Sequence, residues 1–472
     1  MQITSGIKVH FVGIAGSGMS PLARILIELG CKVSGSDIKQ SIVLEELKSK
    51  GAYVYTGHDA IIASKAEMVV VSAAVPKDDI EVDAARRSGI PIITRAELLG
   101  LLMNPRYGIA ITGTHGKTTT SSMVSSILED AGLNPTFMVG SGFKGISGGG
   151  KLGSGDMMVV EADEAYGSFL KLNPSIAVVT NIDDDHRDFY GSFEGILNGF
   201  REFLGRIKPD GFAIMCLDDE HVSAMIDEVP CKVITYGVNT QAQYTVEDVK
   251  INGFGTDFTV LKDKKKLGMV NLRIPGMHNV SDALAAVVVA DQLEVDFEII
   301  RKSLASFEGA KRRCQVLSDN DSKITIVDDY AHHPVEIKAT LSALKGAVSQ
   351  LNGNCDNEDS RKLISVFQPQ RYTRTSFLKD EFKKAFGHSD LIIITEIYAE
   401  GTGESPIPGV NGKILADAIS EYEKRDVIFA SDPDEIIDIV KKNLNSGDFV
   451  VFMGAGDITK TAHRFAEEIE RQ

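Results

Sequence analysis

The sequence predicts an α/β protein of three domains, each built on a mainly parallel sheet. Short apolar segments rich in β-branched residues are repeatedly followed by a glycine turn and then by a segment with helical apolar spacing, which is the pattern of parallel strand–helix units. A chain of 472 residues, 43% hydrophobic and 25% charged, exceeds what one core organises. The pattern starts afresh twice, so we predict domains at 1–104, 105–313 and 314–472.

The first predicted domain ends before Asn104-Pro105, a pair typical of linkers. Strands and helices alternate along it, which predicts a Rossmann-like sheet. Its segments, in order, are KVHFVG, PLARILIELG, CKVSGSD, LEELKSKG, MVVVSAAV and PIITRAELLGLLM.

The second domain opens with YGIAITGTHGKTTTSSMVSSILEDAG and continues through MMVVEADE, IAVVTNIDDDH, GFAIMCLDD and KVITYG. Alternating residues from about 238 to 275 then predict a small antiparallel insertion, and a helix at 278–293 follows. The third domain repeats the strand–helix pattern with KITIVDD, LISVFQ, LIIITEIY, DVIFAS and DFVVFMGAGD, so we predict a second Rossmann-like sheet. Two polar segments, 141–155 and 351–362, are predicted to be mobile loops.

Charge and cysteine usage exclude several classes of protein. A net charge of −16 and a pI near 5.2 disfavour a nucleic-acid or anionic-membrane partner, because phosphate binding needs clustered Lys and Arg. The five cysteines are scattered without a C-x-x-C pair, which predicts a reducing compartment and no zinc or dithiol site. Neither a secretion signal nor an apolar run long enough to span a bilayer is found, so we expect a cytoplasmic location.

A glycine loop with a lysine lies between a predicted strand and a predicted helix in the second domain. There, backbone N–H groups and the positive helix end converge on phosphate oxygens, which predicts a P-loop ATPase domain. Lys117 would reach the β- and γ-phosphates, and Thr118 would bind a bridging magnesium ion. Ile111 stands where the strict phosphate-loop pattern has glycine, so the loop is a shortened variant. The alternative is a glycine turn of purely structural use. The loop comprises Gly113, Thr114, His115, Gly116, Lys117, Thr118 and Thr119.

Metal-binding candidates follow two other strands of this domain. Glu161 ends the strand MMVVE, at the sheet edge where open α/β folds bind ligands, and Asp163 and Glu164 are nearby alternatives. A solvated acidic strand end is the competing interpretation. His186 follows the strand IAVVT and could bind a metal or orient an acceptor, although a lone histidine is a weak signal and more often has a structural or surface role.

The first domain carries its own glycine loop, with Gly13, Gly16 and Gly18 directly after its first strand. Asp37 ends the second strand and could bond a ribose hydroxyl. The spacing is G-x-x-G-x-G rather than G-x-G-x-x-G, so a dinucleotide, a nucleotide sugar and a structural turn all remain open.

Ten segments together resemble the Mur ligase family, and within it the alanine-adding branch, over nearly the whole length. They are HFVGIAGSGMS, GTHGKTTTSSM, VVEADE, SFLKLNP, AVVTNIDDDH, PGMHNVSDALAA, KRRCQVL, DDYAHHPVEIKATL, FQPQRYTRT and FMGAGDI. The resemblance implies a UDP-sugar domain, an ATPase domain and an amino-acid-binding domain. It further implies ATP and Mg²⁺ as cofactors, UDP-N-acetylmuramate and L-alanine as substrates, an acyl-phosphate intermediate and a monomer or homodimer.

Site roles follow from the resemblance position by position. It implies that the Lys117 loop binds ATP, that Thr118, Glu161 and His186 bind magnesium, and that the glycine loop with Asp37 binds the UDP-sugar. It places Asn279, Arg313 and Asp329 around adenine and ribose, and His333, Arg371 and Arg374 where the two substrates meet. Arginine forks suit carboxylates and phosphates, although a solvated surface pair is the competing interpretation for Arg371 and Arg374.

Two departures and three rival functions accompany the resemblance. Gln370 replaces the usual histidine before Arg-Tyr-Thr-Arg, and Ala165-Tyr166 replaces the usual Ser-Asp after EADE.

The rival functions are a ligase that adds a preformed peptide to the same sugar nucleotide, a nucleotide-dependent regulator, and an NAD-dependent dehydrogenase using the first glycine loop.

Overall fold

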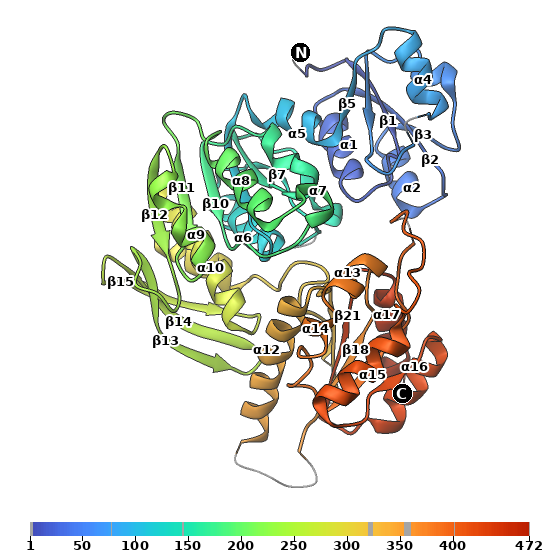
Figure 1. The fold of residues 1–472 in the computed structure, drawn as a ribbon. Helices are drawn as coiled ribbons and strands as arrows, with labels where there is room; N and C mark the ends of the chain where they lie inside the picture. Colours follow the sequence, from blue (N-terminus) through green and yellow to red (C-terminus); the bar gives the residue numbers. More distant parts are fainter. Residues whose placement is uncertain are drawn as a thin grey trace. The chain divides into compact units, whose positions relative to one another are not determined.

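A computed structural model describes residues 3–76, 78–143, 146–319, 324–353, 360–400 and 402–471 (Figure 1). These residues form three sheets with mostly parallel strands, which confirms the predicted α/β class. The chain divides into two compact units. One consists of 1–246, 260–268 and 281–304, and the other of 247–259, 269–280 and 305–472. The domain limits at 1–104, 105–313 and 314–472 stay predictions.

The first sheet has five parallel strands in the order β3-β2-β1-β4-β5 (Figure 1). The order reverses between β1 and β4, and ligands of such sheets bind beyond the carboxyl ends of the strands at that point. The strands are β1 (Lys8–Val12), β2 (Lys32–Asp37), β3 (Tyr53–Thr56), β4 (Met68–Val71) and β5 (Ile92–Thr94). The helices are α1 (Met19–Glu28), α2 (Ile42–Ser49), α3 (Ala60–Ala63), α4 (Ile80–Arg87) and α5 (Arg95–Met103).

Side-chain caps set the start of four of these helices. Ser41, Asp59 and Asp79 each accept hydrogen bonds from first-turn amides of α2, α3 and α4. Thr94 and Glu97 form a reciprocal capping box at the start of α5. Such caps satisfy amides that a helix leaves without an internal partner. Helix α1 instead begins at Gly18 without a side-chain cap, directly after the glycine loop.

The central sheet has the strand order β15-β14-β13-β12-β11-β10-β6-β9-β7-β8. Strands β10, β6 and β9 are parallel neighbours, so the segments that follow them emerge at one edge. The strands are β6 (Tyr107–Thr112), β7 (Thr136–Met138), β8 (Gly150–Lys151), β9 (Met157–Glu161), β10 (Ile176–Val179), β11 (Phe212–Cys216), β12 (Lys232–Tyr236), β13 (Tyr244–Asn252), β14 (Gly255–Lys262) and β15 (Lys265–Leu272). The helices are α6 (Lys117–Asp130), α7 (Arg187–Tyr190), α8 (Phe193–Leu204), α9 (Glu220–Ala224), α10 (Met277–Gln292) and α11 (Phe297–Ala305), with 3₁₀ turns η1 (Ser147–Gly149), η2 (Ala165–Lys171) and η3 (Ile226–Glu228).

Helix α6 is buried from Thr118 to Leu128 although it is rich in Ser and Thr. Two of its hydroxyls bond within the helix, since Ser121 donates to the carbonyl of Thr118 (3.2 Å) and Ser125 donates to that of Ser121 (2.7 Å). Because α6 is buried over most of its length, its first turn is held in a fixed position beside the central sheet.

Strands β13, β14 and β15 form the predicted antiparallel insertion at one end of the central sheet (Figure 1). Two residues separate β13 from β14, and two separate β14 from β15. Sheet neighbours joined so tightly must run antiparallel. Asp263 and Lys264, in the second turn, both have positive φ (49° and 64°), as a type I′ hairpin turn requires.

The third sheet has the order β16-β17-β21-β18-β19-β20, with β16 antiparallel and the other strands parallel. Its central strands β18 and β21 are wholly buried, as expected for a sheet covered on both faces. The strands are β16 (Gln315–Asp319), β17 (Thr325–Asp329), β18 (Leu363–Phe367), β19 (Leu391–Ile394), β20 (Ile428–Phe429) and β21 (Phe449–Met453). The helices are α12 (Pro334–Asn352), α13 (Tyr372–Phe377), α14 (Lys379–Phe382), α15 (Gly412–Glu423), α16 (Pro433–Asn443) and α17 (Ile458–Glu470).

The two predicted mobile loops have different outcomes. In segment 141–155, positions 144 and 145 lie outside the described residues, and residues 147–151 form η1 and the strand β8, which pairs antiparallel with β7. Positions 354–359 of the second loop lie outside the described residues. Among the described helices, none combines the length and the apolar character needed to cross a bilayer.

Candidate active site

The loop between β6 and α6 requires glycine at two positions. Gly113 and Gly116 have φ of 131° and 85°, in the region that L-residues rarely adopt. A Cβ on Gly113 would collide with the Thr180 hydroxyl, and one on Gly116 would collide with the Asp282 carboxylate. Gly116, the residue before α6, provides no side-chain cap. The first amides of α6 are therefore arranged as in anion-binding helix starts.

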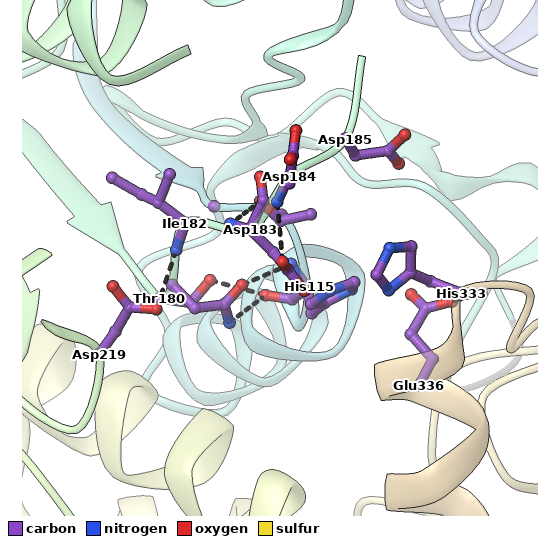
Figure 2. Close-up of polar contacts among 12 residues, drawn as sticks. His115, Thr180, Ile182, Asp183, Asp184, Asp185, Asp219, His333 and Glu336 are labelled. Atoms are coloured by element: carbon purple, nitrogen blue, oxygen red, sulfur yellow. Dashed lines mark hydrogen bonds and ion pairs between the residues drawn. The ribbon is translucent and has the colours of Figure 1, made fainter. Parts of the chain in front are cut away.

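The segment after β10 holds this loop in place (Figure 2). The amide of His115 donates to Oδ1 of Asn181 (2.8 Å), and the Thr180 hydroxyl donates to the carbonyl of His115 (2.6 Å). Asp183 donates its amide to the Thr114 hydroxyl (2.8 Å), and its carboxylate lies 3.2 Å from His115 Nε2. The loop conformation therefore depends on the neighbouring strand.

Lys117, the first residue of α6, folds its side chain back across the loop. Its Nζ donates to the carbonyls of Gly113 (2.6 Å) and Thr114 (3.1 Å) and to both carboxylate oxygens of Glu164 (3.0 and 2.8 Å). Burial alone would lower the pKa of the Lys117 ammonium, but Glu164 and Asp163 outweigh burial and raise that pKa. The neighbouring carboxylates therefore favour the charged form of Lys117 at the loop.

Glu164 is only 3% exposed. Burial raises the pKa of its carboxyl, and the Lys117 charge opposes that rise only in part. Its position depends on the 3₁₀ turn η2, in which Tyr166 and Gly167 both have positive φ (55° and 64°). The hydroxyl of Tyr190 donates to the Glu164 carbonyl (2.7 Å) and fixes the start of this turn.

Thr118 and Glu161 meet beside the lysine. The Thr118 hydroxyl donates to Oε2 of Glu161 (2.9 Å), and the amide of Gly140 donates to the same oxygen (2.6 Å). Thr118 is 5% exposed, whereas Glu161 is partly exposed at the end of β9. The structure thus brings together the hydroxyl and carboxylate that the sequence predicts as metal ligands.

His186 lies in the turn before α7, with a positive φ of 61°. Its Nε2 is 3.9 Å from Oε1 of Glu164. Ligand atoms of Asp163, Glu164 and His186 all lie within 4.8 Å of one another. A non-glycine residue in this backbone region is uncommon and is often found at functional sites.

These side chains fit a magnesium ion. Carboxylate and hydroxyl oxygens are the ligands that this hard cation prefers. In the described part of the chain, both hydrogen bonds to Glu161 reach Oε2, and none reaches Oε1. One carboxylate oxygen therefore stays available for a cation beside the phosphate loop.

The glycine loop of the first sheet follows β1. Gly13 has a φ of 79°, and Asp37 accepts a hydrogen bond from the amide of Ala15 (3.0 Å). A Cβ on Gly18 would lie 2.7 Å from Cδ of Arg95, so that arginine covers the loop. Arg95 Nη2 also lies 3.7 Å from Asp163. Gly13, Gly16 and Gly18 thus form a tight turn with one cation beside it.

In the second unit, the predicted nucleotide residues Asn279 and Asp329 are buried, and Arg313 is partly exposed. Asn279 donates to the carbonyl of Pro275 (2.6 Å). Asp329 accepts from the amides of Cys314 (2.8 Å) and Ala331 (2.7 Å), and burial raises the pKa of its carboxyl to about 6. Arg313 favours the charged form of Asp329 and stacks on Tyr330, 5.1 Å from its ring centroid.

His333 precedes α12, where Glu336 accepts from its amide (3.2 Å) and completes a capping box. Arg371 has a positive φ of 71° and donates from Nε to Glu404 (2.7 Å). Arg374 donates to Oε1 of Gln370 (2.7 Å). The amide at position 370 therefore serves Arg374 as a hydrogen-bond acceptor.

Comparison with known proteins identifies the family. Residues 8–107 match the Mur ligase family catalytic domain, 111–290 the Mur ligase middle domain, and 312–456 the Mur ligase glutamate ligase domain. The chain belongs to the Mur ligase family.

Relatives of this Mur ligase match it over nearly their whole length. UDP-N-acetylmuramate--L-alanine ligase of Geotalea daltonii is 44% identical over 98% of both chains. The protein of that name from Myxococcus xanthus is 42% identical over 98% of this chain and 94% of its own. The crystal structure of UDP-N-acetylmuramate-alanine ligase MurC from Thermotoga maritima has a TM-score of 0.81 at 28% identity, covering 98% and 99%. A murein peptide ligase from Psychrobacter arcticus, 23% identical over 99% of both chains with a TM-score of 0.70, shares the fold.

Sequence reasoning about this Mur ligase missed several site residues. The sequence predicts Glu164 only as an alternative metal ligand, whereas in the structure it is the ion-pair partner of Lys117. Arg95, Gly140, Asn181 and Asp282 were not singled out at all. Only Asn181 lies in a segment that signals its place, since it directly follows Thr180 at the end of a strand predicted to share the site's edge.

Proposed function

We propose that this Mur ligase joins L-alanine to the lactyl carboxylate of UDP-N-acetylmuramate, with cleavage of ATP to ADP and phosphate. The observation that carries the proposal is the ion-paired Lys117 at a glycine loop, one residue before the Thr118–Glu161 pair. Relatives at 41–44% identity that bear this substrate pair in their names support the choice of substrates.

The chain's own residues divide the work of phosphoryl transfer. Amides of residues 113–118 and the Lys117 ammonium bind the β- and γ-phosphates, and Lys117 stabilises charge that spreads over the transferred group. Glu161, Thr118 and His186 would hold magnesium, which neutralises phosphate charge when bound. The carboxylate oxygen attacks the γ-phosphorus, the bond to the bridging oxygen of ADP breaks, and an acyl phosphate forms.

The amide then forms in a second step. The alanine amine attacks the acyl carbon, phosphate leaves with the carbon–oxygen electron pair, and the amine loses a proton. Holding both reactants in line is worth roughly 7–11 kcal/mol. We propose that Asn279, Arg313 and Asp329 bind adenine and ribose, and that His333, Arg371 and Arg374 bind where the substrates meet.

The first glycine loop suits the sugar nucleotide. Gly13, Gly16 and Gly18 let backbone amides approach a diphosphate, and Arg95 adds a positive charge beside them. Asp37 orders the loop through Ala15. We place the reaction in the cytoplasm, in the synthesis of peptidoglycan precursors, with ATP and Mg²⁺ required.

The rival functions are less well supported. A ligase for preformed peptides would resemble the Psychrobacter arcticus murein peptide ligase, yet that likeness is 23% identical against 44% for the alanine ligase of Geotalea daltonii. A regulator would need no second substrate, and a dehydrogenase would leave the Lys117 loop without a purpose.

Release of ADP tests the proposal. With ATP and Mg²⁺, release should require both UDP-N-acetylmuramate and L-alanine, and a tripeptide should not replace alanine. Release with ATP alone would favour the regulator, and release with the tripeptide alone would favour the recycling ligase.

A further inference from the structure

Gly140 lies where two strands of the central sheet end together. Strand β7 runs parallel to β9, with Met138 opposite Val160, so the residues after β7 lie beside Glu161. The Gly140 amide donates to Oε2 of Glu161 at 2.6 Å. The Thr118 hydroxyl reaches the same oxygen from α6 at 2.9 Å. Two donors from different elements therefore hold one oxygen of this carboxylate.

We propose that Gly140 is a positioning residue for magnesium binding: its amide holds Oε2 of Glu161, and its lack of a side chain leaves room for that carboxylate beside Thr118, so that Oε1 stays available to a cation. The inference rests on the proposed function of Glu161 and Thr118 as magnesium ligands. A hydroxyl rotates about its C–O bond, whereas a backbone amide cannot turn without moving the chain. Gly140 is thus the rigid donor of the two. Groups that orient a metal ligand commonly change metal affinity by about 10- to 100-fold when removed.

The requirement for glycine here comes from the site rather than from the backbone. Gly140 is not among the glycines with positive φ, so its backbone conformation would accept alanine. A Cβ would lie 2.6 Å from Glu161 Oε2, 2.9 Å from Glu161 Oε1 and 2.6 Å from Thr118 Oγ1. Real Cβ atoms essentially never approach so closely. An added methyl group therefore displaces the carboxylate and the hydroxyl.

At two neighbouring glycines, an added Cβ would meet backbone atoms instead of side chains. A Cβ on Gly142 would strike the carbonyl oxygen of Ile146, and one on Gly149 would strike the carbonyl oxygen of Val139. Backbone atoms cannot move without a change of fold, so those two glycines serve the loop itself. At Gly140 the nearest atoms all belong to side chains, those of Glu161 and Thr118, which can shift while the fold is kept.

The test is the substitution Gly140→Ala, with ligase activity measured over a range of Mg²⁺ concentrations. We expect the Mg²⁺ concentration at half-maximal rate to rise by about 10-fold or more. The KM for UDP-N-acetylmuramate at saturating Mg²⁺ and the melting temperature should stay close to wild type. Gly205→Ala is the matched control, because a Cβ there meets nothing closer than 3.4 Å.

A double-mutant cycle separates positioning from general damage. Glu161→Asp withdraws the carboxylate from position 140, so Gly140→Ala should raise the Mg²⁺ requirement much less in that background. An unchanged Mg²⁺ requirement in Gly140→Ala, or equal effects in both backgrounds, would overturn the proposal. If the wild type itself shows no release of ADP that depends on both substrates, it is the proposed function that fails.

Discussion

The glycine loops of the first and central sheets use the same backbone device with different side chains. Each follows a buried parallel strand, contains glycine with positive φ, and leads into a helix without a side-chain cap. The central loop adds Lys117 inside the loop and Glu161 at its edge. The first loop is held by Asp37, and its cation comes from Arg95 outside it. We infer that the first loop binds phosphates and the central loop transfers one.

Two buried carboxylates sharpen the same contrast. Glu81, at the start of α4, is fully buried and accepts from the Asp59 amide (3.0 Å), His58 Nδ1 (3.1 Å) and the hydroxyls of Ser36 and Tyr55. Glu164 is almost as buried, but its side-chain hydrogen bonds come from Lys117. Several hydrogen-bond donors surround Glu81, which has a structural role. Glu164 instead depends on Lys117, whose ammonium would also bind the phosphates of a nucleotide.

The largest expected effect is at the central loop. Lys117→Ala should lower the rate of ADP release by about 1,000-fold or more, because it removes the charge that stabilises phosphoryl transfer. It also leaves Glu164 buried without its cation, which costs about 3–5 kcal/mol of folding stability. Initial rates and denaturant unfolding measure the two losses.

Adding Glu164→Gln to Lys117→Ala separates the loss of rate from the loss of stability. The neutral amide needs no cation, so the double variant should recover most of the stability and none of the rate. Recovery of the rate would mean that Lys117 acts only by holding Glu164, contrary to the role we assign it.

The next largest expected effect is on the pH dependence of folding stability, through Glu81 in the first domain. Burial alone would raise the pKa of Glu81, but His10, the Asp59 amide, Ser36 and Tyr55 outweigh burial and lower it to about 2. A carboxyl group whose pKa is lowered by folding stabilises the protein at pH values above 4.5, its ordinary pKa. This stabilisation is lost as the pH falls toward 2. The contribution is about 3 kcal/mol.

Glu81→Gln should therefore reduce the free energy of unfolding at pH 7 by about 3 kcal/mol and flatten its decline between pH 4.5 and 2. Chemical unfolding at several pH values measures this. A variant as stable as wild type at pH 7 would show that the hydrogen-bond network around Glu81 does not stabilise its charge.

The smallest effect is at the first glycine loop. Asp37→Asn weakens the charge-assisted hydrogen bond from Ala15 while keeping the side chain's shape, so the KM for UDP-N-acetylmuramate should rise by about 10-fold. The KM for ATP should stay within about twofold, because the two loops lie on different sheets. An equal rise in both values would contradict the division of labour between the loops.

Local sequence patterns predicted the strand–loop–helix units, the places of Lys117 and Thr118, and the position of Glu161 at a strand end. They could not predict partners set by sheet order. Gly140 reaches Glu161 only because β7 lies beside β9, and Asp282 approaches Gly116 from a helix 166 positions further along the chain. Glu164 meets Lys117 through a turn with positive φ at Tyr166, which the residue type disfavours. These contacts arise from long-range packing.

The most direct test of phosphoryl transfer to a carboxylate follows an oxygen label. UDP-N-acetylmuramate labelled with ¹⁸O in its lactyl carboxylate is converted with ATP, Mg²⁺ and L-alanine, and the released phosphate is analysed by mass spectrometry. If the central loop transfers the γ-phosphate to that carboxylate, each phosphate should carry one labelled oxygen. Unlabelled phosphate, formed together with the amide product, would contradict the mechanism.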